Sequence, residues 1–271
     1  MDHTDKNSKK IAVAVIPARY GSTRLPGKPL LQIAGKALIL WVAERALAAQ
    51  SVSRAIVATD DQRIFDMVTA AGFEAMMTRG DHSSGTDRVA EVARDLDAEI
   101  IVNLQGDEPL IEPETIDRAV RQLEINDEVL MATTSEPIAE AAEVLNPAVV
   151  KVVTDDDGYA TSFSRNPTPW PNQAVTRYGS IEAALRNEPA LLFSFRKHTG
   201  LYVYRRDFLL EFAAWPQTES EASESLEQLR ALERGVKIKV VEASSPSIGV
   251  DTIEDLERVR AIIEREIQIA V

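Results

Sequence analysis

The sequence predicts an α/β protein with a mostly parallel sheet and helices on both of its faces. Over residues 11–104, short apolar runs alternate with segments of helical spacing, which is the pattern of consecutive β-α-β units. The runs are continuously apolar, as expected for strands that are buried on both faces. The length of 271 residues and the hydrophobic content of 45% allow one large domain, or a main domain with a smaller lobe.

The first half of the chain accounts for four strands and three helices. The strands are predicted at residues 11–16, 54–59, 73–77 and 99–104, and the helices at 36–50, 60–71 and 86–96. Asp60 or Asp61 can cap the second helix, because a short acidic side chain accepts from the free N–H groups of the first turn. Gly72 ends that helix, and Thr86 or Asp87 begins the next.

The second half is less regular. Strands are predicted at residues 149–153, 159–163, 201–204 and 237–241, and helices at 225–234 and 255–266. Residues 165–190 carry four prolines, so we interpret them as a long excursion that forms a flap or a dimer element. We expect this segment to be mobile without ligand, because proline blocks regular strand pairing.

The loop after the first strand reads PARYGSTRLPGKP and resembles a phosphate-binding P-loop only superficially. Gly21 and Gly27 are separated by five residues, whereas the P-loop motif has four and continues with Lys and then Ser or Thr. Here Pro29 follows Lys28. Proline supplies neither the hydroxyl that would bind magnesium nor an N–H for a phosphate. The P-loop interpretation therefore fails.

The same loop still favours anions. Arg19, Arg24 and Lys28 are cationic, and residues 6–43 contain seven basic residues and no acidic residue, although the whole chain has a net charge of -13. A positive island in an acidic protein indicates a local anion site rather than a nucleic-acid surface. The alternative is a solvated basic turn that binds nothing.

Ligands of open α/β sheets bind outside the carboxyl ends of the strands, so the polar loops there are the candidates for function. In QGDEP, Asp107 is a natural Mg²⁺ ligand near phosphates, or the segment is a simple turn. In GVDT, Asp251 is either a second ligand or only the N-cap of the last helix. In RGDHSSGTDR, Ser84 and Gly85 can present backbone groups to a base or a sugar, or the segment merely starts a helix.

Composition excludes several classes of protein. The chain has no cysteine, so disulfides, thiolate metal sites and a cysteine nucleophile are ruled out. The polar N-terminus does not resemble a signal peptide, and no window reaches the roughly 18–20 apolar residues of a membrane span. A pI of about 4.8 argues against nucleic acid as a partner. We therefore expect a cytoplasmic protein without membrane insertion, and a flexible N-terminus at residues 1–10.

Nine stretches, taken in order, make the sequence resemble the 3-deoxy-manno-octulosonate cytidylyltransferase (CMP-Kdo synthetase) family. They are IPARYGSTRLPGKPL, VATDD, DHSSGTDRVAEV, VNLQGDEPLI, NPAVVKVV, FSR, HTGLYVYR, LEQLRALERG and GVDTIEDLERVR. Any one of them is a weak signal, but nine in order are hard to obtain by chance. The resemblance runs from about residue 11 to the final helix.

The resemblance implies a Rossmann-like nucleotidyltransferase fold over residues 11–271, with a mostly parallel mixed sheet flanked by helices. It implies a smaller dimerisation and sugar-side lobe at about residues 155–235, and a homodimer. The implied reaction transfers CMP from CTP to the anomeric hydroxyl of the acidic sugar Kdo and releases pyrophosphate. The product would enter lipopolysaccharide, a capsule or another glycan.

The resemblance also implies roles for individual residues. Arg19 and Lys28 would hold the CTP phosphates with Ser22 nearby, and Arg79, Ser84 and Gly85 would line the cytidine side. The sugar would be surrounded by Gln105, Arg165, His198, Tyr202, Glu227 and Gln228. Asp107 and Asp251 would bind Mg²⁺, with Asp107 as the candidate bridge between two ions. Arg19, Lys28 and Asp107 form the implied catalytic set.

Three positions depart from the family pattern: Ser225 before LEQLR, Thr199 in HTGLYVYR, and the segment SPSI before GVDT. Because they flank the implied sugar pocket, they bear on the acceptor more than on CTP. The alternatives that stay open are a cytidylyltransferase for 8-amino-Kdo or another acidic ulosonate such as sialic acid, a hexose-1-phosphate nucleotidyltransferase, and a non-catalytic protein that binds nucleotide sugars.

Overall fold

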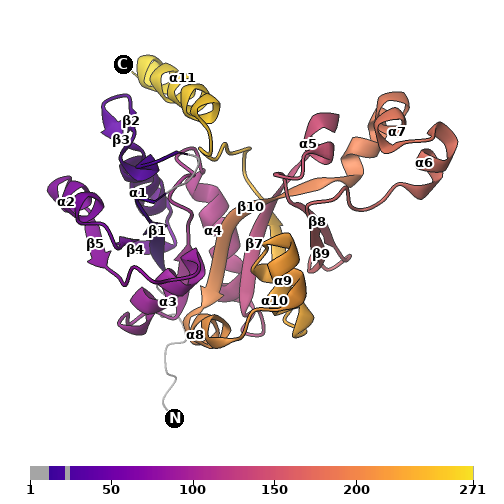
Figure 1. Cartoon of the computed structure of the whole chain (residues 1–271). Coiled ribbons are helices and arrows are strands. Elements are labelled where there is room, and N and C mark those ends of the chain that lie inside the picture. The colour runs from indigo at the N-terminus through magenta and orange to yellow at the C-terminus, as the bar shows by residue number, and fades with distance from the viewer. Residues whose placement is uncertain (1–11, 22–24, 271) are drawn as a thin grey trace, which may run out of the picture.

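The structure, a computed structural model, describes residues 12–21 and 25–270. At its centre lies a nine-stranded mixed sheet (Figure 1). Seven strands follow the order β11-β7-β10-β6-β1-β4-β5, while β8 pairs with β10 and β9 pairs with β8. The strands are β1 (Ala12–Ala18), β4 (Val52–Thr59), β5 (Glu74–Met77), β6 (Ile100–Asn103), β7 (Met131–Pro137), β8 (Lys151–Thr154), β9 (Ala160–Ser164), β10 (Arg196–Arg205) and β11 (Ile238–Glu242). A separate hairpin joins β2 (Gln32–Ile33) and β3 (Lys36–Ala37).

Helices follow most of the strands. They are α1 (Leu38–Ala48), α2 (Gln62–Ala70), α3 (Gly85–Arg94), α4 (Pro113–Ile125), α5 (Ala141–Leu145), α6 (Asn172–Tyr178), α7 (Ile181–Asn187), α8 (Arg206–Ala214), α9 (Glu219–Glu224), α10 (Gln228–Glu233) and α11 (Ile253–Ala270), with 3-10 turns η1 (Lys28–Leu30) and η2 (Pro189–Ser194). No helix among the described residues is both long and apolar enough to span a bilayer.

The strand directions agree with the mostly parallel mixed sheet expected from the sequence. β1 pairs in parallel with both β4 and β6, and β4 pairs in parallel with β5. β10 runs antiparallel to its neighbours β6 and β7, and β11 is parallel to β7. The carboxyl ends of β1, β4, β5 and β6 therefore lie along one edge of the sheet, where the candidate loops begin.

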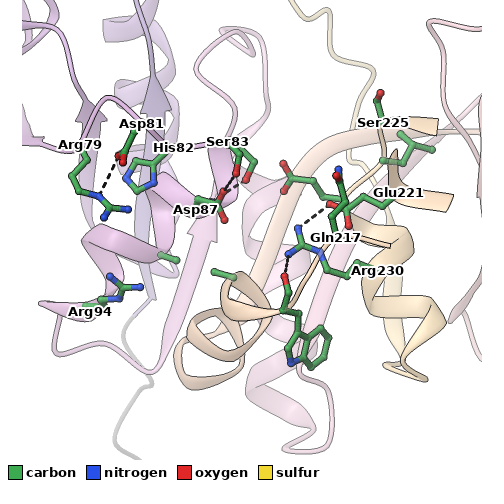
Figure 2. Close-up of a pocket in the computed structure, with 16 residues that line it drawn as sticks. Arg79, Asp81, His82, Ser83, Asp87, Arg94, Gln217, Glu221, Ser225 and Arg230 are labelled. Atoms are coloured by element: carbon green, nitrogen blue, oxygen red, sulfur yellow. Dashed lines mark hydrogen bonds and ion pairs between the residues drawn. The ribbon is translucent and has the colours of Figure 1, made fainter. Parts of the chain in front are cut away.

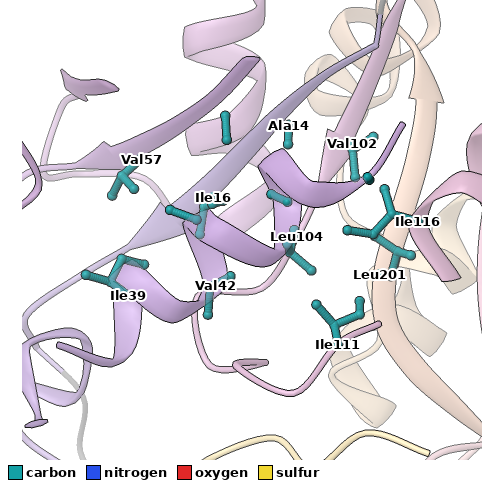
Figure 3. Close-up of a cluster of buried hydrophobic side chains, with 14 of the residues drawn as sticks. Ala14, Ile16, Ile39, Val42, Val57, Val102, Leu104, Ile111, Ile116 and Leu201 are labelled. Atoms are coloured by element: carbon teal, nitrogen blue, oxygen red, sulfur yellow. The ribbon is translucent and has the colours of Figure 1, made fainter. Parts of the chain in front are cut away.

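Alternation along the central strands divides the core into two layers. In β1, Ala14 and Ile16 face one layer, whereas Val13 and Val15 face the other, because successive side chains of a strand point to opposite faces. The first layer is packed by α1, α4 and α11, and the second by α3, α8 and α10. Figure 3 shows part of the first layer, where Ile39 and Val42 of α1 lie beside Ile16 and Leu104.

The predicted elements of the first half correspond to observed ones, with two corrections. The helix predicted to begin at Thr86 or Asp87 begins at Gly85, because Ser84 is its N-cap and accepts from the Asp87 N–H. The helix predicted at residues 36–50 begins later, at Leu38, because residues 36–37 form a strand of the small hairpin. No element was predicted at residues 105–148, where the structure has α4, β7 and α5. β7 escapes a search for apolar runs because Thr133, Thr134 and Glu136 are polar yet buried in the sheet.

The segment at residues 165–190 contains two short helices, α6 and α7, followed by η2. Together with α5 they surround a small hydrophobic cluster of their own, which includes Val144, Leu185 and Phe195. Figure 1 shows α5, α6 and α7 standing away from the main sheet, beyond the start of β10. The division into a main domain and a lobe at about residues 155–235 stays a prediction, as does the mobility of 165–190. Residues 1–10 lie outside the described residues.

Candidate active site

Lys28, Asp107 and Asp251 meet at the carboxyl edge of the sheet, although they come from three distant parts of the chain. The Lys28 Nζ donates to Asp107 Oδ2 at 2.7 Å and to Asp251 Oδ1 at 3.1 Å. Burial alone would lower the pKa of Lys28, but the two carboxylates outweigh it and raise that pKa above its ordinary value. The lysine is therefore a permanent cation held between two carboxylates.

The two loops that carry these carboxylates are joined through their backbones. The Val250 N–H donates to the Asp107 carbonyl at 2.8 Å. Gly106 lies directly against β1, because a Cβ at this position would come within 3.0 Å of the Pro17 carbonyl. A side chain there would push the loop away from the sheet. The glycine in QGDEP thus keeps Asp107 close to the end of β1.

The N-cap alternative for Asp251 is wrong. Thr252 caps α11, since its Oγ1 accepts from the Asp255 N–H at 3.1 Å, and the Asp255 carboxylate accepts from the Thr252 N–H at 2.9 Å. This reciprocal pair is a capping box. It leaves the Asp251 carboxylate, whose side chain is 46% exposed, to face Lys28 instead.

Glu108, the next residue in QGDEP, lies between the two loops in a partly buried position. Ser247 Oγ donates to its Oε2 at 2.6 Å. Burial, and then the negative charge of Asp107, raise the pKa of Glu108 to about 7. The sequence analysis singled out Asp107 but not Glu108, because a Glu in a turn normally points to solvent.

A cavity of about 290 Å³ opens at the same edge. Its walls include Arg19 at the end of β1, Ser84 and Gly85 at the start of α3, Gln105 after β6, and Glu227 before α10. Five of the predicted residues thus line one space. Gln105 lies two positions before Asp107, so the loop that carries Asp107 begins at the wall of this cavity. We call the group formed by Lys28, Asp107 and Asp251 the charged junction.

Arg88 also lines this cavity, and sequence reasoning missed it. Its guanidinium is nearly buried, lies 3.3 Å from Asp60 Oδ2, and donates to Thr78 Oγ1. The residue therefore ties the loops after β4 and β5 to α3. The signal was present in TDR, but helix-start loops in many proteins contain such residues.

A second cavity, of about 490 Å³, adjoins the first and shares Ser84 and Glu227 with it. Figure 2 shows Arg79 and Asp87 on one wall and Glu221 and Arg230 on the opposite wall. Arg79 is exposed and lies 3.4 Å from Asp81. The structure therefore places Arg79 in this outer cavity and not in the smaller one.

His198 and Tyr202 are on β10, where the strand passes the end of β6. Thr133 donates to the Leu201 carbonyl at 2.7 Å, so at 2.8 Å from His198 Nε2 it acts as an acceptor. That assignment puts the imidazole proton on Nε2. Burial lowers the pKa of His198 to about 3, and the rings of Phe163 and Tyr202 pack against it. The histidine is neutral at physiological pH.

Glu227 and Gln228 lie at the start of α10. Burial raises the pKa of Glu227, while hydrogen bonds from Thr86 and Ser84 lower it to a smaller extent. Gln228 is 3% exposed, and within the described part of the chain its Nε2 has no hydrogen-bond partner. A buried donor without a partner is costly, so this amide is a candidate to bind a ligand.

Arg165 is turned toward backbone carbonyls. Its Nε donates to the Glu224 carbonyl at 2.6 Å and its Nη1 to the Pro147 carbonyl at 3.1 Å. In this structure it joins the end of β9 to the segment before α10 and to the segment before β8. Ser22, which was expected near the phosphates, lies outside the described residues, and so does Arg24.

The residues at this edge fit a small cation whose other ligands come from substrate and water. No group of three or more His, Cys, Asp or Glu side chains suited to a metal occurs among residues 12–21 and 25–270. Mg²⁺ bound to nucleotides uses only one or two carboxylates, with phosphate oxygens and water completing its shell. Asp107 and Asp251 supply two such oxygens around one ammonium group.

Comparison with known proteins identifies the family. The profile of the family described as Cytidylyltransferase matches residues 13–238. The chain is 53% identical over 249 residues to the 3-deoxy-manno-octulosonate cytidylyltransferase of Trichlorobacter lovleyi, which covers 92% of this chain and 96% of that protein. It is 51% identical over 255 residues to the Pseudomonas fluorescens protein of the same name, covering 92% and 97%.

Solved structures agree with these relatives. A CMP:2-keto-3-deoxy-manno-octonic acid synthetase complexed with CTP is similar to this chain with a TM-score of 0.84 and 43% identity, covering 94% of this chain and 99% of that one. A 4-diphosphocytidyl-2C-methyl-D-erythritol synthase from Anaerococcus prevotii, at 16% identity with a TM-score of 0.58, covers 94% and 97% and shares the fold. The expected nucleotidyltransferase fold is confirmed. The chain is a nucleotidyltransferase that belongs to the 3-deoxy-manno-octulosonate cytidylyltransferase family.

Proposed function

We propose that the protein transfers CMP from CTP to the anomeric hydroxyl of 3-deoxy-D-manno-octulosonate. The observation that carries this proposal is the meeting of Lys28, Asp107 and Asp251 beside a polar cavity, in a chain 43% identical to a synthetase whose structure holds CTP. The hydroxyl oxygen forms a bond to the α-phosphorus, the bond to the bridging oxygen breaks, and pyrophosphate leaves with that electron pair. The hydroxyl proton passes to solvent.

Positive charge from the chain permits two anions to approach each other. Arg19 lines the 290 Å³ cavity and Lys28 stands between two carboxylates at its side. We assign both to the triphosphate, where fixed cations stabilise charge that develops on the leaving group.

We propose that Asp107 and Asp251 hold Mg²⁺ when CTP is bound. The bound ion would neutralise phosphate charge and lower the pKa of the attacking hydroxyl. Asp107 and Asp251 would hold the ion, and Lys28, which now donates to both carboxylates, would then be available to contact the phosphates. No separate general base is assigned.

The cytidine and sugar sides are assigned from the family resemblance, and the cavities support part of it. We assign Arg79, Ser84 and Gly85, which line the two cavities, to the nucleoside, with Ser22 near the phosphates. We assign the acceptor to Gln105 and Glu227, which line the smaller cavity, together with Arg165, His198, Tyr202 and Gln228. The unpaired Nε2 of Gln228 and the neutral imidazole of His198 support a ligand rich in hydroxyl groups, because both can form hydrogen bonds without adding charge.

We further propose that two copies associate through the lobe, in the cytoplasm where CTP is made. Phe193 is 88% exposed and Trp170 is 48% exposed, and large exposed aromatic side chains are typical of association surfaces. Light scattering of the parent and of Phe193→Glu tests this proposal. If the parent is a dimer and Phe193→Glu is a monomer, the result supports association through the lobe. If the substitution leaves the mass unchanged, the lobe does not mediate association.

The test of the activity is pyrophosphate release from CTP and Mg²⁺ with four acceptors in parallel. These are Kdo, 8-amino-Kdo, N-acetylneuraminate and a hexose 1-phosphate. We expect release with Kdo to exceed that with each of the others by at least about tenfold, which is the discrimination that a few polar contacts provide. A preference for another acceptor would reassign the substrate. No release with any acceptor, together with CTP binding, would favour a nucleotide-binding protein without catalysis.

A further inference from the structure

One polar contact between the loops at the charged junction has no place in the proposed reaction. Glu108 follows Asp107, but its carboxyl turns away from Lys28 and toward the segment that leads to Asp251. Its Oε2 accepts from Ser247 Oγ at 2.6 Å. The other carboxyl oxygen, Oε1, lies against Gly249, because a Cβ at Gly249 would come within 3.0 Å of it. The backbone before Asp251 therefore runs in direct contact with the Glu108 carboxyl.

Ser247 is held from two sides. Its hydroxyl donates to Glu108, and its backbone N–H donates to Glu136 Oε1 at 2.9 Å. Glu136 is buried in β7 at 2% exposure and lies 3.3 Å from the Lys197 ammonium. The chain before Asp251 is thus attached to the sheet through β7 and to the QGDEP loop through Glu108.

The geometry of this contact requires an acceptor at position 108. Ser247 Oγ donates to Glu108 Oε2, while the Ser247 N–H is already bonded to Glu136. An apolar side chain of similar size would leave the partly buried Ser247 hydroxyl without this acceptor. The bond therefore links the QGDEP loop to one defined point of the segment before Asp251.

We infer that Glu108 is a positioning residue that, through Ser247, sets where Asp251 faces Asp107. Two hydrogen bonds join the loop of Asp107 to the loop of Asp251. One runs from the Val250 N–H to the Asp107 carbonyl, and the other runs from Ser247 Oγ to Glu108 Oε2. The inference rests on the proposed metal-dependent transfer. In this inference Glu108 has no contact with the reacting atoms. It acts by holding the Asp251 carboxylate in position relative to the Asp107 carboxylate.

The test compares Glu108→Ala, Glu108→Gln and Ser247→Ala in the full chain, with Ser245→Ala as the matched control. Loss of a group behind a metal ligand typically costs about 10–100-fold in activity or metal affinity. We expect this loss for Glu108→Ala and about tenfold for Ser247→Ala, with a higher Mg²⁺ concentration for half-maximal rate in both. Glu108→Gln keeps an acceptor oxygen, so it should stay within about threefold of the parent.

The double variant Glu108→Ala/Ser247→Ala should be no worse than Glu108→Ala, because both changes remove the same bond. Mn²⁺ binding in the presence of CTP, followed by electron paramagnetic resonance, supplies a readout apart from turnover. We expect weaker Mn²⁺ binding in Glu108→Ala and Ser247→Ala, and parent-like binding in Glu108→Gln and Ser245→Ala.

Three results would overturn the inference. They are Ser247→Ala with parent-like Mg²⁺ dependence and Mn²⁺ affinity, Glu108→Gln as impaired as Glu108→Ala, or fully additive losses in the double variant. If Glu108→Ala does not fold, Ser247→Ala and Glu108→Gln decide the question. If the parent releases no pyrophosphate, the proposed function fails, and Mn²⁺ binding by the variants still tests the positioning role.

Discussion

The charged junction differs in construction from a second region, the β10–α10 wall, which consists of His198 and Tyr202 on β10 and Gln228 on α10. At the junction, the Lys28 ammonium pairs with both Asp107 and Asp251, and the three side chains remain partly exposed. On the wall, His198 is neutral and Gln228 carries a buried donor without a partner among the described residues. The junction relies on ion pairs, whereas these two side chains of the wall carry no charge.

This difference indicates how a protein can bind two anions next to each other. In the proposed function, the junction binds the highly charged triphosphate, because fixed charges act on it strongly in a partly desolvated site. The wall would select the acceptor by hydrogen bonds to its hydroxyl groups, because unpaired polar groups penalise a ligand that cannot satisfy them. Changes to the junction should therefore affect turnover and CTP, whereas changes to the wall should affect the acceptor.

The largest expected effect comes from removing the carboxylates. Asp107→Asn and Asp251→Asn should each lower the rate by at least about a hundredfold, as expected when a preorganised charge-stabilising group is lost. Asparagine forms turns as readily as aspartate, so both variants should melt within a few degrees of the parent. Asp107→Asn should be the worse of the two if it bridges two ions. Near-normal turnover at saturating Mg²⁺ would remove that residue from the site.

Removing the cations should weaken CTP binding. Lys28→Ala and Arg19→Ala each delete a long side chain without opening a core cavity, so the fold should survive. Losing one charge-assisted contact to a phosphate should weaken CTP about tenfold or more, since such contacts contribute about 1.5–3 kcal/mol. Calorimetric titration with CTP measures the change, and thermal melting controls for folding. Unchanged affinity in both variants would defeat the assignment of the loop to phosphates.

Replacing the buried amide separates binding from stability. Gln228→Leu removes a donor that has no partner among the described residues, so it should leave stability unchanged or raise it by about 1 kcal/mol. The same change should raise the KM for Kdo about tenfold, the size expected for one lost hydrogen bond to a hydroxyl. Gln122→Leu on α4, away from the wall, is the matched control. A destabilised Gln228→Leu with an unchanged KM would assign this amide to the fold alone.

Another expected effect is on stability at low pH. Because the folded state holds His198 unprotonated down to about pH 3, only the unfolded state gains this proton below its ordinary pKa of about 6.5. The protein then loses stability as the pH falls from about 6.5 toward 3. His198→Gln should reduce this loss by about 2 kcal/mol at pH 4.5, allowing for partial exposure. Chemical denaturation of both proteins at pH 7 and 4.5 measures it, and equal losses would contradict a buried neutral imidazole.

The two regions also differ in how well the sequence predicts them. The loops of the junction follow apolar strands, so the rule that ligands bind at carboxyl ends of strands selected Asp107 and Lys28 in advance. The family resemblance then added Gln228 and His198, whose spacing alone carries no signal. Position in the sequence could not show that Thr252 and not Asp251 caps α11, because both residue types serve as caps.

The missed elements have a physical cause as well. β7 is buried with polar side chains, since Thr133 binds His198 and the Leu201 carbonyl inside the sheet, so no apolar run marks it. Glu108 was missed because its partner Ser247 lies 139 positions away. A hydrogen bond between distant loops depends on the folded structure, so no pattern of neighbouring residues can predict it.

The most direct test of the division between junction and wall is a set of paired Michaelis constants. The KM for CTP and the KM for Kdo would be measured by pyrophosphate release for the parent, Lys28→Ala and Gln228→Leu. The account predicts that Lys28→Ala raises the KM for CTP about tenfold or more, and that Gln228→Leu raises the KM for Kdo about tenfold. In each variant the other constant should stay within about threefold of the parent. If both variants raised the same constant, the two regions would not divide the substrates, and the account would be contradicted.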